Sequence, residues 1–118
     1  MIIVQISDLH VGSQFLQDKF DQLVDEVNQL HPDVIVITGD LTNEGLIQEY
    51  EKCKTLLTKF TTKKIIAISG NHDYRNTGYL LFKKFFPFEA INELNDDVIL
   101  VTLGTARPDR NEGEVGYR

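Results

Sequence analysis

Residues 36–45 have the sequence Val-Ile-Thr-Gly-Asp-Leu-Thr-Asn-Glu-Gly, and this stretch is the main indicator of the fold. It continues from Val34 and Ile35, so that a run of β-branched residues leads through Gly39 to the carboxylate of Asp40. A short apolar run of this kind is typical of a strand buried in a parallel sheet. Ligands of such sheets bind beyond the carboxyl ends of the strands, which is where Asp40 would lie.

Two more apolar runs, at residues 2–6 and 65–68, flank this stretch in the sequence and also lead into polar residues. Asp8 follows the first run and Asn71 the last, so that Asp8 and Asp40 are 32 positions apart and Asp40 and Asn71 are 31 apart. Both intervals are close to the roughly 30 residues of one βαβ unit. The sequence therefore predicts an α/β fold whose centre is a βαβαβ parallel sheet with buried strands.

The two segments between the runs carry apolar residues at helical spacing. One face of the first helix would hold Leu16, Phe20, Leu23, Val24, Val27 and Leu30, and one face of the second would hold Leu46, Tyr50, Cys53, Leu57 and Phe60. The first helix should end at His31, because the residue before Pro32 disfavours helical geometry. We expect Cys53 to pack in the second helix as a small hydrophobic side chain.

The pattern is weaker after residue 75. An aromatic-rich segment at residues 79–88 predicts a helix that stops at Pro87, with its rings in the core or in an interface. Residues 98–103 predict a fourth strand, and the polar, glycine-rich residues 104–118 predict a loop.

Length and composition exclude several classes of protein. The 118 residues suit one small domain, and the formal net charge of −6 lacks the basic footprint of a nucleic-acid-binding protein. The single cysteine excludes an intrachain disulfide and fits a reducing compartment. The N-terminus does not resemble a signal peptide and no apolar run is long enough to cross a membrane, so we expect a cytoplasmic protein. An acidic chain that handles phosphate would need bound cations to supply positive charge.

The polar residues after the three runs suit a metal site. Asp8 and His10 are two positions apart and can turn toward one ion, while Asp40 carries two oxygens and can bridge two ions. Asn71 offers a neutral carbonyl oxygen. This mixed ligand set suits Mn²⁺, Fe or Zn²⁺. Two such cations, about 3.5–4 Å apart, could clamp the oxygens of a phosphoryl group and activate a bridging water.

The three clusters also resemble a known family. Asp8-Leu9-His10, Gly39-Asp40 and Gly70-Asn71-His72-Asp73 are similar, in order and in spacing, to the D-x-H, G-D and G-N-H-[DE] motifs of the calcineurin-like metallophosphoesterases. The resemblance implies that Asp8 and His10 bind the first of two divalent metal ions, that Asp40 bridges both ions and that Asn71 binds the second.

The same resemblance implies roles for the two residues that end the third motif. His72 would contact the phosphate of a small phosphoester substrate and assist the leaving group, and Asp73 would orient His72. Tyr74 and Arg75 follow directly, and both a phosphate contact and a structural role stay open for them.

The family pattern has further histidines, including a closing G-H-x-H motif, but this chain has three histidines and none after His72. The family also packs two sheets face to face, and this chain accounts for the first half of that α/β/β/α sandwich. We therefore expect residues 1–118 to be a single, C-terminally incomplete metallophosphoesterase domain. Its uncovered sheet would favour association, which predicts a homo-oligomer.

Two functions stay open on the sequence alone. The first is a metal-dependent phosphohydrolase that attacks phosphodiesters with a metal-activated hydroxide; residues 36–45 are similar to the branch that contains cyclic-nucleotide phosphodiesterases. The second is a non-catalytic fragment with a partial metal site that associates through its exposed sheet. The sequence reveals neither the substrate nor the identity of the metal.

Overall fold

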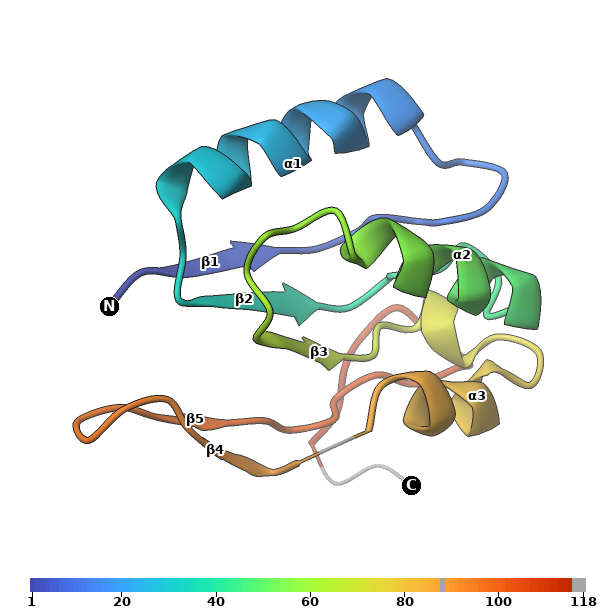
Figure 1. Cartoon of the computed structure of the whole chain (residues 1–118). Helices are drawn as coiled ribbons and strands as arrows, with labels where there is room; N and C mark the ends of the chain where they lie inside the picture. The colour runs from blue at the N-terminus through green and yellow to red at the C-terminus, as the bar shows by residue number, and fades with distance from the viewer. Residues whose placement is uncertain (88, 116–118) are drawn as a thin grey trace.

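The computed structural model describes residues 1–87 and 89–115. Its centre is a sheet of three parallel strands in the order β1 (Ile3–Ile6), β2 (Val34–Thr38) and β3 (Ile65–Ile68). Helix α1 (Gln17–Leu30) joins β1 to β2, and α2 (Ile47–Leu57) joins β2 to β3 (Figure 1). The predicted α/β fold with a βαβαβ parallel sheet is confirmed.

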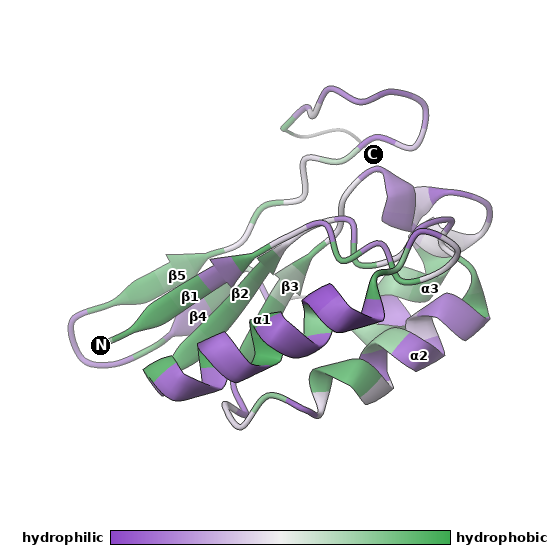
Figure 2. Cartoon of the chain, turned by 90° about the horizontal axis from the view of Figure 1, so that it is seen from above, coloured by the Kyte–Doolittle hydropathy of each residue, from purple (hydrophilic) through white to green (hydrophobic). Residues whose placement is uncertain are grey.

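Both helices lie on one side of the sheet (Figure 2). The side chains that face them come from alternate strand positions, which pair in register as Val4 with Ile35 and Ile6 with Ile37. Ile35 and Ile37 in the central strand are fully buried. The prediction of a buried first strand is wrong, because β1 is an edge strand and Ile3 is 43% exposed.

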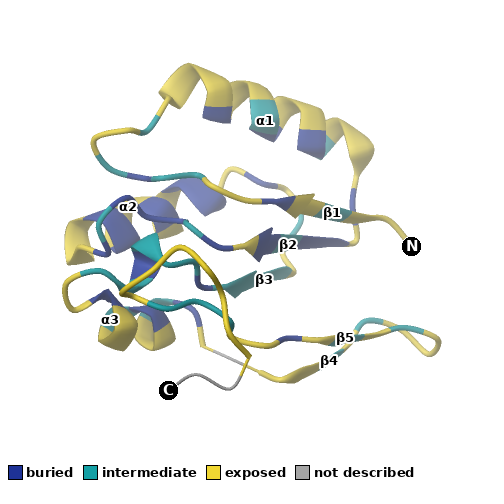
Figure 3. Ribbon diagram, turned by 180° about the vertical axis from the view of Figure 1, so that it is seen from behind, coloured by how far each residue is buried: buried dark blue, intermediate teal, exposed yellow. Residues whose placement is uncertain are grey.

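Helix α1 buries Phe20, Val24 and Val27 against the sheet, as its spacing predicts. Leu16 and Leu30 were expected on the same face but are 65% and 56% exposed. Leu16 is the N-cap of the helix and Leu30 is its last residue, so both stand at its ends. Figure 3 shows that the buried residues of α1 lie on the side toward the sheet. The helix ends at His31, as predicted, and this residue takes a left-handed conformation with φ of 49°.

Helix α2 buries Tyr50, Cys53 and Leu57. Leu46 precedes its first turn, and Phe60 follows its last turn but remains buried. The prediction that Cys53 packs as a small hydrophobic side chain is confirmed, since the residue is fully buried.

The aromatic segment forms α3 (Gly78–Phe85), which follows a short 3₁₀ turn, η1 (His72–Tyr74). The helix ends before Pro87, as predicted. Phe82 and Phe86 join the core, so the expected core role of these rings is confirmed. Phe88, which closes the segment, lies outside the described residues.

Strand β5 (Ile99–Val101) confirms the predicted fourth strand, but it is not part of the parallel sheet. It pairs antiparallel with β4 (Ile91–Glu93), a strand that the sequence did not predict. Residues 104–115 form no helix or strand, as expected for a loop, and residues 116–118 lie outside the described part of the chain.

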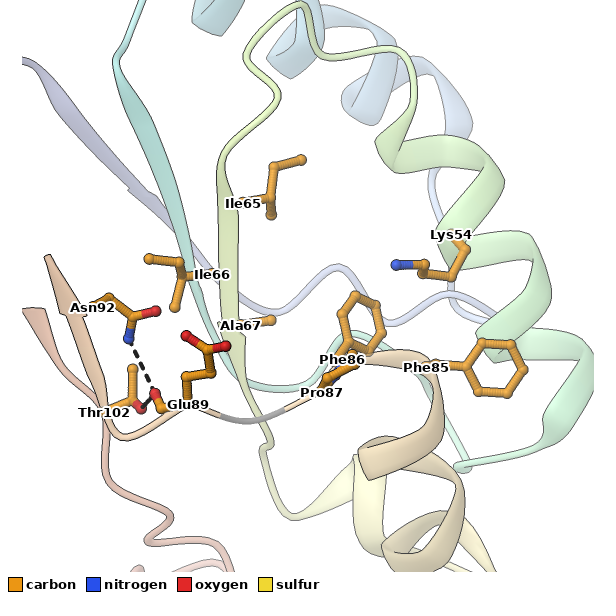
Figure 4. Close-up of a pocket in the computed structure, with 10 residues that line it drawn as sticks. All are labelled: Lys54, Ile65, Ile66, Ala67, Phe85, Phe86, Pro87, Glu89, Asn92 and Thr102. Carbon is orange, nitrogen blue, oxygen red and sulfur yellow. Dashed lines mark hydrogen bonds between the residues drawn. The ribbon is translucent and has the colours of Figure 1, made fainter. Parts of the chain in front are cut away.

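The β4–β5 hairpin lies beside β3 without pairing with it. A cavity of about 180 Å³ separates them, with Ile65 and Ala67 of β3 on one side and Asn92 and Thr102 on the other (Figure 4). The polar side is held by the carbonyl oxygen of Glu89, which accepts hydrogen bonds from the side chains of Asn92 (3.0 Å) and Thr102 (2.6 Å). No candidate metal ligand lines this cavity.

The sheet face opposite α1 and α2 is more open. Gln5 and Thr38 are exposed there, and the Gln5 amide donates a hydrogen bond to the Thr38 hydroxyl (3.0 Å). Val36, Ile66 and Ile68 are half-buried. None of the helices in the described residues combines the length and the apolar character that a membrane span requires.

Candidate metal centre

Backbone hydrogen bonds bring the segments after β1 and β2 together. The N–H of Asp8 donates to the carbonyl of Gly39 (3.0 Å), and the N–H of His10 donates to the carbonyl of Asp40 (3.0 Å). Val11 continues the pairing by donating to Leu41. The parallel ladder thus extends past the strands, which places Asp8 and His10 next to Asp40.

The segment after β3 joins the same edge through the Asp40 side chain. One carboxylate oxygen, Oδ1, accepts a hydrogen bond from the N–H of His72 (3.0 Å). Gly70 lies so close to Asp40 that a Cβ on it would collide with the Asp40 backbone and carboxylate. Gly39, with φ of 106°, adopts a conformation that favours glycine. The glycines of the motifs therefore allow the close approach of two loops.

His10, Asp40 and His72 form one group, in which a ligand atom from each lies within 4.8 Å of the others. His10 Nε2 is 3.5 Å from Asp8 Oδ1 and 3.7 Å from Asp40 Oδ2, longer than a typical hydrogen bond of about 2.7–3.2 Å. The His10 and His72 rings meet edge to face with centroids 4.7 Å apart. Two imidazoles and the Asp40 carboxylate that converge in this way fit a divalent cation as their shared partner, and Asp8 lies outside this group but next to His10.

The backbone of this centre is strained. Asp8, His10 and Asp40 have φ values of 61°, 49° and 54°, in the left-handed region that non-glycine residues rarely adopt. Such conformations persist where the surrounding structure enforces them, and they cluster at functional sites. Here the backbone bonds between the two loops enforce them.

The structure places Asn71 at the start of η1, directly before His72. Its side-chain nitrogen donates to the side-chain oxygen of Asn111 (3.3 Å), in the loop near the end of the chain. Asn111 could not be predicted as a partner of Asn71, because it lies in a polar segment without a motif. The contact orients the amide group whose oxygen the sequence predicts as a metal ligand.

His72 is held by a main-chain group. Its Nδ1 lies 2.8 Å from the carbonyl oxygen of Asn43. Since a carbonyl oxygen only accepts hydrogen bonds, this contact requires a proton on Nδ1 and leaves Nε2 as the nitrogen with a free lone pair in the neutral ring. Residue type does not predict a main-chain contact, so Asn43 could not be found as a partner of His72 from the sequence.

Asp73 contacts two of the motif loops. Its fully buried carboxylate accepts hydrogen bonds from the N–H groups of Leu41 (3.3 Å), Thr42 (2.8 Å) and Gly70 (2.8 Å) and from the Thr42 hydroxyl (2.9 Å). These hydrogen bonds tie the second and third motif loops together, and none of them reaches the His72 ring, so the predicted orienting role of Asp73 stays a prediction. Burial raises the pKa of Asp73 above its usual value, although the four donors act in the opposite direction.

Two more buried titratable groups, Tyr50 and Cys53, lie on α2, and the first of them contacts this junction. The Tyr50 hydroxyl donates a hydrogen bond to the Asp73 carbonyl (2.6 Å), and burial raises the pKa of Tyr50. Burial also raises the pKa of the Cys53 thiol to about 12, so the thiol stays protonated and unreactive at neutral pH.

For Arg75 the structure shows a structural contact. Its guanidinium forms an ion pair with Glu44 at 2.9 Å, and the neighbouring Asn76 donates to the Glu44 carbonyl (2.8 Å). These contacts fasten the segment after η1 to the loop after β2.

Comparison with known proteins agrees with this geometry. A model of the family described as calcineurin-like phosphoesterase matches residues 1–112. The chain is 28% identical to a cAMP/cGMP dual specificity phosphodiesterase of Mycobacterium tuberculosis, over 97% of this chain and 41% of that protein.

Two further relatives give similar matches. A transmembrane protein with a metallophosphoesterase domain from Danio rerio is 35% identical, over 93% of this chain and 24% of that protein. A probable glycerophosphodiester phosphodiesterase of Arcobacter nitrofigilis is 31% identical, over 80% of this chain and 38% of that protein. The chain thus spans less than half the length of these curated relatives.

Proposed function

Because this chain belongs to the calcineurin-like metallophosphoesterase family of hydrolases, we propose that its three motif loops contribute to a centre of two divalent cations that hydrolyses phosphodiesters. One observation carries the proposal: His10, Asp40 and His72, which come from three different loops, present ligand atoms within 4.8 Å of one another. The alternative is that these side chains are an ordinary solvated cluster. Such a cluster would not require buried hydrogen bonds that hold three loops together.

Four residues would hold the cations, which we expect to be Mn²⁺, Fe or Zn²⁺. Asp8 and His10 would bind the first ion and Asn71 the second. Asp40 would bridge them, and its position supports this role, because Oδ1 points to the His72 loop and Oδ2 to His10. Asp40 and Asn71 alone are too few ligands for the second ion. We therefore propose that residues 1–118 are the first part of one domain.

Bound cations would lower the pKa of a water molecule and neutralise charge on the phosphoryl oxygens. The chain itself positions His72. The Asn43 carbonyl holds the proton on Nδ1, so Nε2 is the nitrogen that faces the substrate, and in the imidazolium form it can give its proton to the leaving oxygen. Hydrolysis would then release an alcohol and a phosphomonoester. Asp73 acts here as a positioning residue, through the loops that it ties together.

We propose a small phosphodiester as the substrate. Relatives named as cyclic-nucleotide and glycerophosphodiester phosphodiesterases support this class, as does the likeness of residues 36–45 to the cyclic-nucleotide branch. A single, buried cysteine fits a reducing compartment, so we propose that the reaction occurs in the cytoplasm.

Metal content and hydrolysis of bis-p-nitrophenyl phosphate test this proposal. We expect turnover with added Mn²⁺ by the complete domain of which residues 1–118 form the first part, and a loss of roughly a hundredfold or more in both Asp40→Ala and His72→Ala. Asp109→Ala is the matched control, because this carboxylate is exposed in the C-terminal loop. No turnover, together with at most one weakly bound metal, would reject the catalytic function of this chain.

The non-catalytic alternative is favoured by a different observation. Four apolar residues of the β4–β5 hairpin and its continuation are between 55% and 64% exposed: Ile91, Ile99, Val101 and Leu103. An apolar surface of this kind favours contact with a second copy of the chain. Light scattering at increasing concentration should then show a dimer, and Val101→Lys should return it to a monomer. A wild-type chain that stays monomeric would exclude this alternative.

A further inference from the structure

A hollow of about 260 Å³ opens directly beside the candidate metal centre. It lies between the segment that follows β1 and the first turns of α1, and Asp8 and His10 form part of its wall. A molecule bound at these two residues would therefore have one side next to the hollow.

The remaining wall is mainly apolar. It is built from five side chains, Leu9, Phe15, Leu16, Phe20 and Leu23, with the polar side chains of Gln14 and Lys19 beside them. The rings of Phe15 and Phe20 pack against each other with centroids 5.6 Å apart. A concave, mostly apolar wall with a few polar groups is the usual make-up of a ligand site. Drug-sized ligands occupy about 300–1,000 Å³, so this hollow suits a single ring or a short chain.

Neither packing in the core nor capping of the helix explains why residue 16 is a leucine. It occupies the N-cap of α1, where serine, threonine, aspartate or asparagine would bind the free N–H groups, and its side chain makes no such bond. It is also 65% exposed, so it adds little to the core. A leucine in this place contributes to the wall of the hollow.

We infer that this hollow receives an apolar, ring-sized substituent of a phosphoester whose phosphoryl group is bound at the metal centre. The inference rests on the proposed function for the position of the phosphoryl group. His10 belongs to both the group of possible metal ligands and the wall, and Asp8, also in the wall, lies 3.5 Å from it, so the phosphoryl group and its substituent would be neighbours. Leu16 and Leu23 then select substrates by the size of this substituent.

Two phosphonates test the inference without any hydrolysis. The chain, labelled with ¹³C in its leucine methyl groups and loaded with diamagnetic Zn²⁺, is titrated with phenylphosphonate and with methylphosphonate and followed by NMR. We expect phenylphosphonate to shift the methyl signals of Leu16 and Leu23. Leu30, exposed at the opposite end of α1, should not respond.

The phenyl compound should bind threefold to tenfold more tightly than the methyl compound. This ratio corresponds to about 25–55 Å² of buried apolar area at about 25 cal/mol per Å². Leu16→Ser should remove most of the preference, whereas Leu30→Ser, the matched control at another exposed leucine of the same helix, should keep it.

Equal affinity for the two phosphonates, or no binding of either, would overturn the inference. A preference that survives in Leu16→Ser would overturn it as well. A failure of the proposed function would give a different experimental result. If the chain hydrolyses no phosphodiester but still binds phenylphosphonate with the Leu16-dependent preference, the hollow is retained and the catalytic proposal is rejected.

Discussion

Residues 1–87 and residues 89–115 use large apolar side chains in different ways. In the first region the apolar residues of the central strand and of one face of each helix form a single core, and the polar residues that end the strands are joined by buried hydrogen bonds. In the second region the hairpin turns Ile91, Ile99 and Val101 outward, and Asp109 in the loop that follows is half-exposed in its ion pair with Arg107. The site therefore rests on a region with a buried core, and the hairpin is an apolar surface that still lacks a partner within the described residues.

The largest difference between the two regions should appear at their aspartates. Asp73→Asn replaces a buried acceptor of four hydrogen bonds with a group that also donates, and we expect it to lower the free energy of unfolding by about 3 kcal/mol. Urea denaturation followed by circular dichroism measures this. Asp109→Asn, whose side chain is exposed in an ion pair with Arg107, should leave the midpoint unchanged. Equal effects of the two substitutions would remove the distinction between the regions.

Substitutions of one glycine in each region should also distinguish the two regions. Gly70→Ala forces a Cβ into Asp40, so we expect the affinity for Mn²⁺ to fall at least about tenfold, with a loss of stability of about 2 kcal/mol. Isothermal titration calorimetry measures the affinity. A Cβ on Gly104 would meet nothing within 4 Å, so Gly104→Ala is the matched control and should bind Mn²⁺ like the wild type. Unchanged affinity in Gly70→Ala would show that Asp40 does not bind the metal in this conformation.

The buried thiol of the first region predicts a pH dependence. The native pKa of Cys53 is raised by burial from 9.0 to about 12, so the native state keeps a proton that the unfolded chain releases. Its contribution to stability is therefore complete below pH 9.0 and is lost as the pH rises toward 12. Between about pH 8 and about pH 10.5, the wild type should lose more stability than Cys53→Ala. Tyr50 is present in both proteins and cancels in the difference, and parallel pH profiles would contradict this prediction.

The smallest effect is expected in the hairpin. Val101→Thr changes a side chain that is 60% exposed, so the free energy of unfolding should change by less than about 0.5 kcal/mol. Thermal denaturation at low protein concentration measures this for the isolated chain. A loss above about 1 kcal/mol would show that the residue is covered in solution, and the loss should then grow with protein concentration if a second copy covers it.

The sequence predicted the first region well because two signals agreed there. Apolar runs and helical spacing gave the order of strands and helices, and the residue after each strand marked the edge at which Asp8, Asp40 and Asn71 would meet. The structure confirms that order. Helical spacing was a poorer guide to burial, because Leu16 and Leu30 are exposed. Spacing places a residue on a face of a helix, but it does not reveal which part of that face other elements cover.

The contacts of His72 and Asp73 and the position of β4 could not be predicted from residue types. The partner of the His72 ring is the main-chain carbonyl of Asn43. Every residue carries a main-chain carbonyl, so the residue type gives no sign of this contact. Asp73 looked like a partner of its neighbour in sequence, yet its carboxylate binds groups about 30 positions away. Strand β4 has three residues, too few for a clear alternation. The roles predicted for Asp8, His10, Asp40 and Asn71 as metal ligands stay predictions until metal binding is measured.

The left-handed backbone at Asp8, His10 and Asp40 has a consequence for protein engineering. Each of these residues holds a conformation that costs on the order of 1 kcal/mol, and glycine would relieve it. A screen that keeps only the most heat-resistant variants would therefore favour glycine at these positions and would discard the ligands. Directed evolution of this chain needs a metal-binding selection alongside the thermal one, because heat resistance and the metal site compete for the same residues.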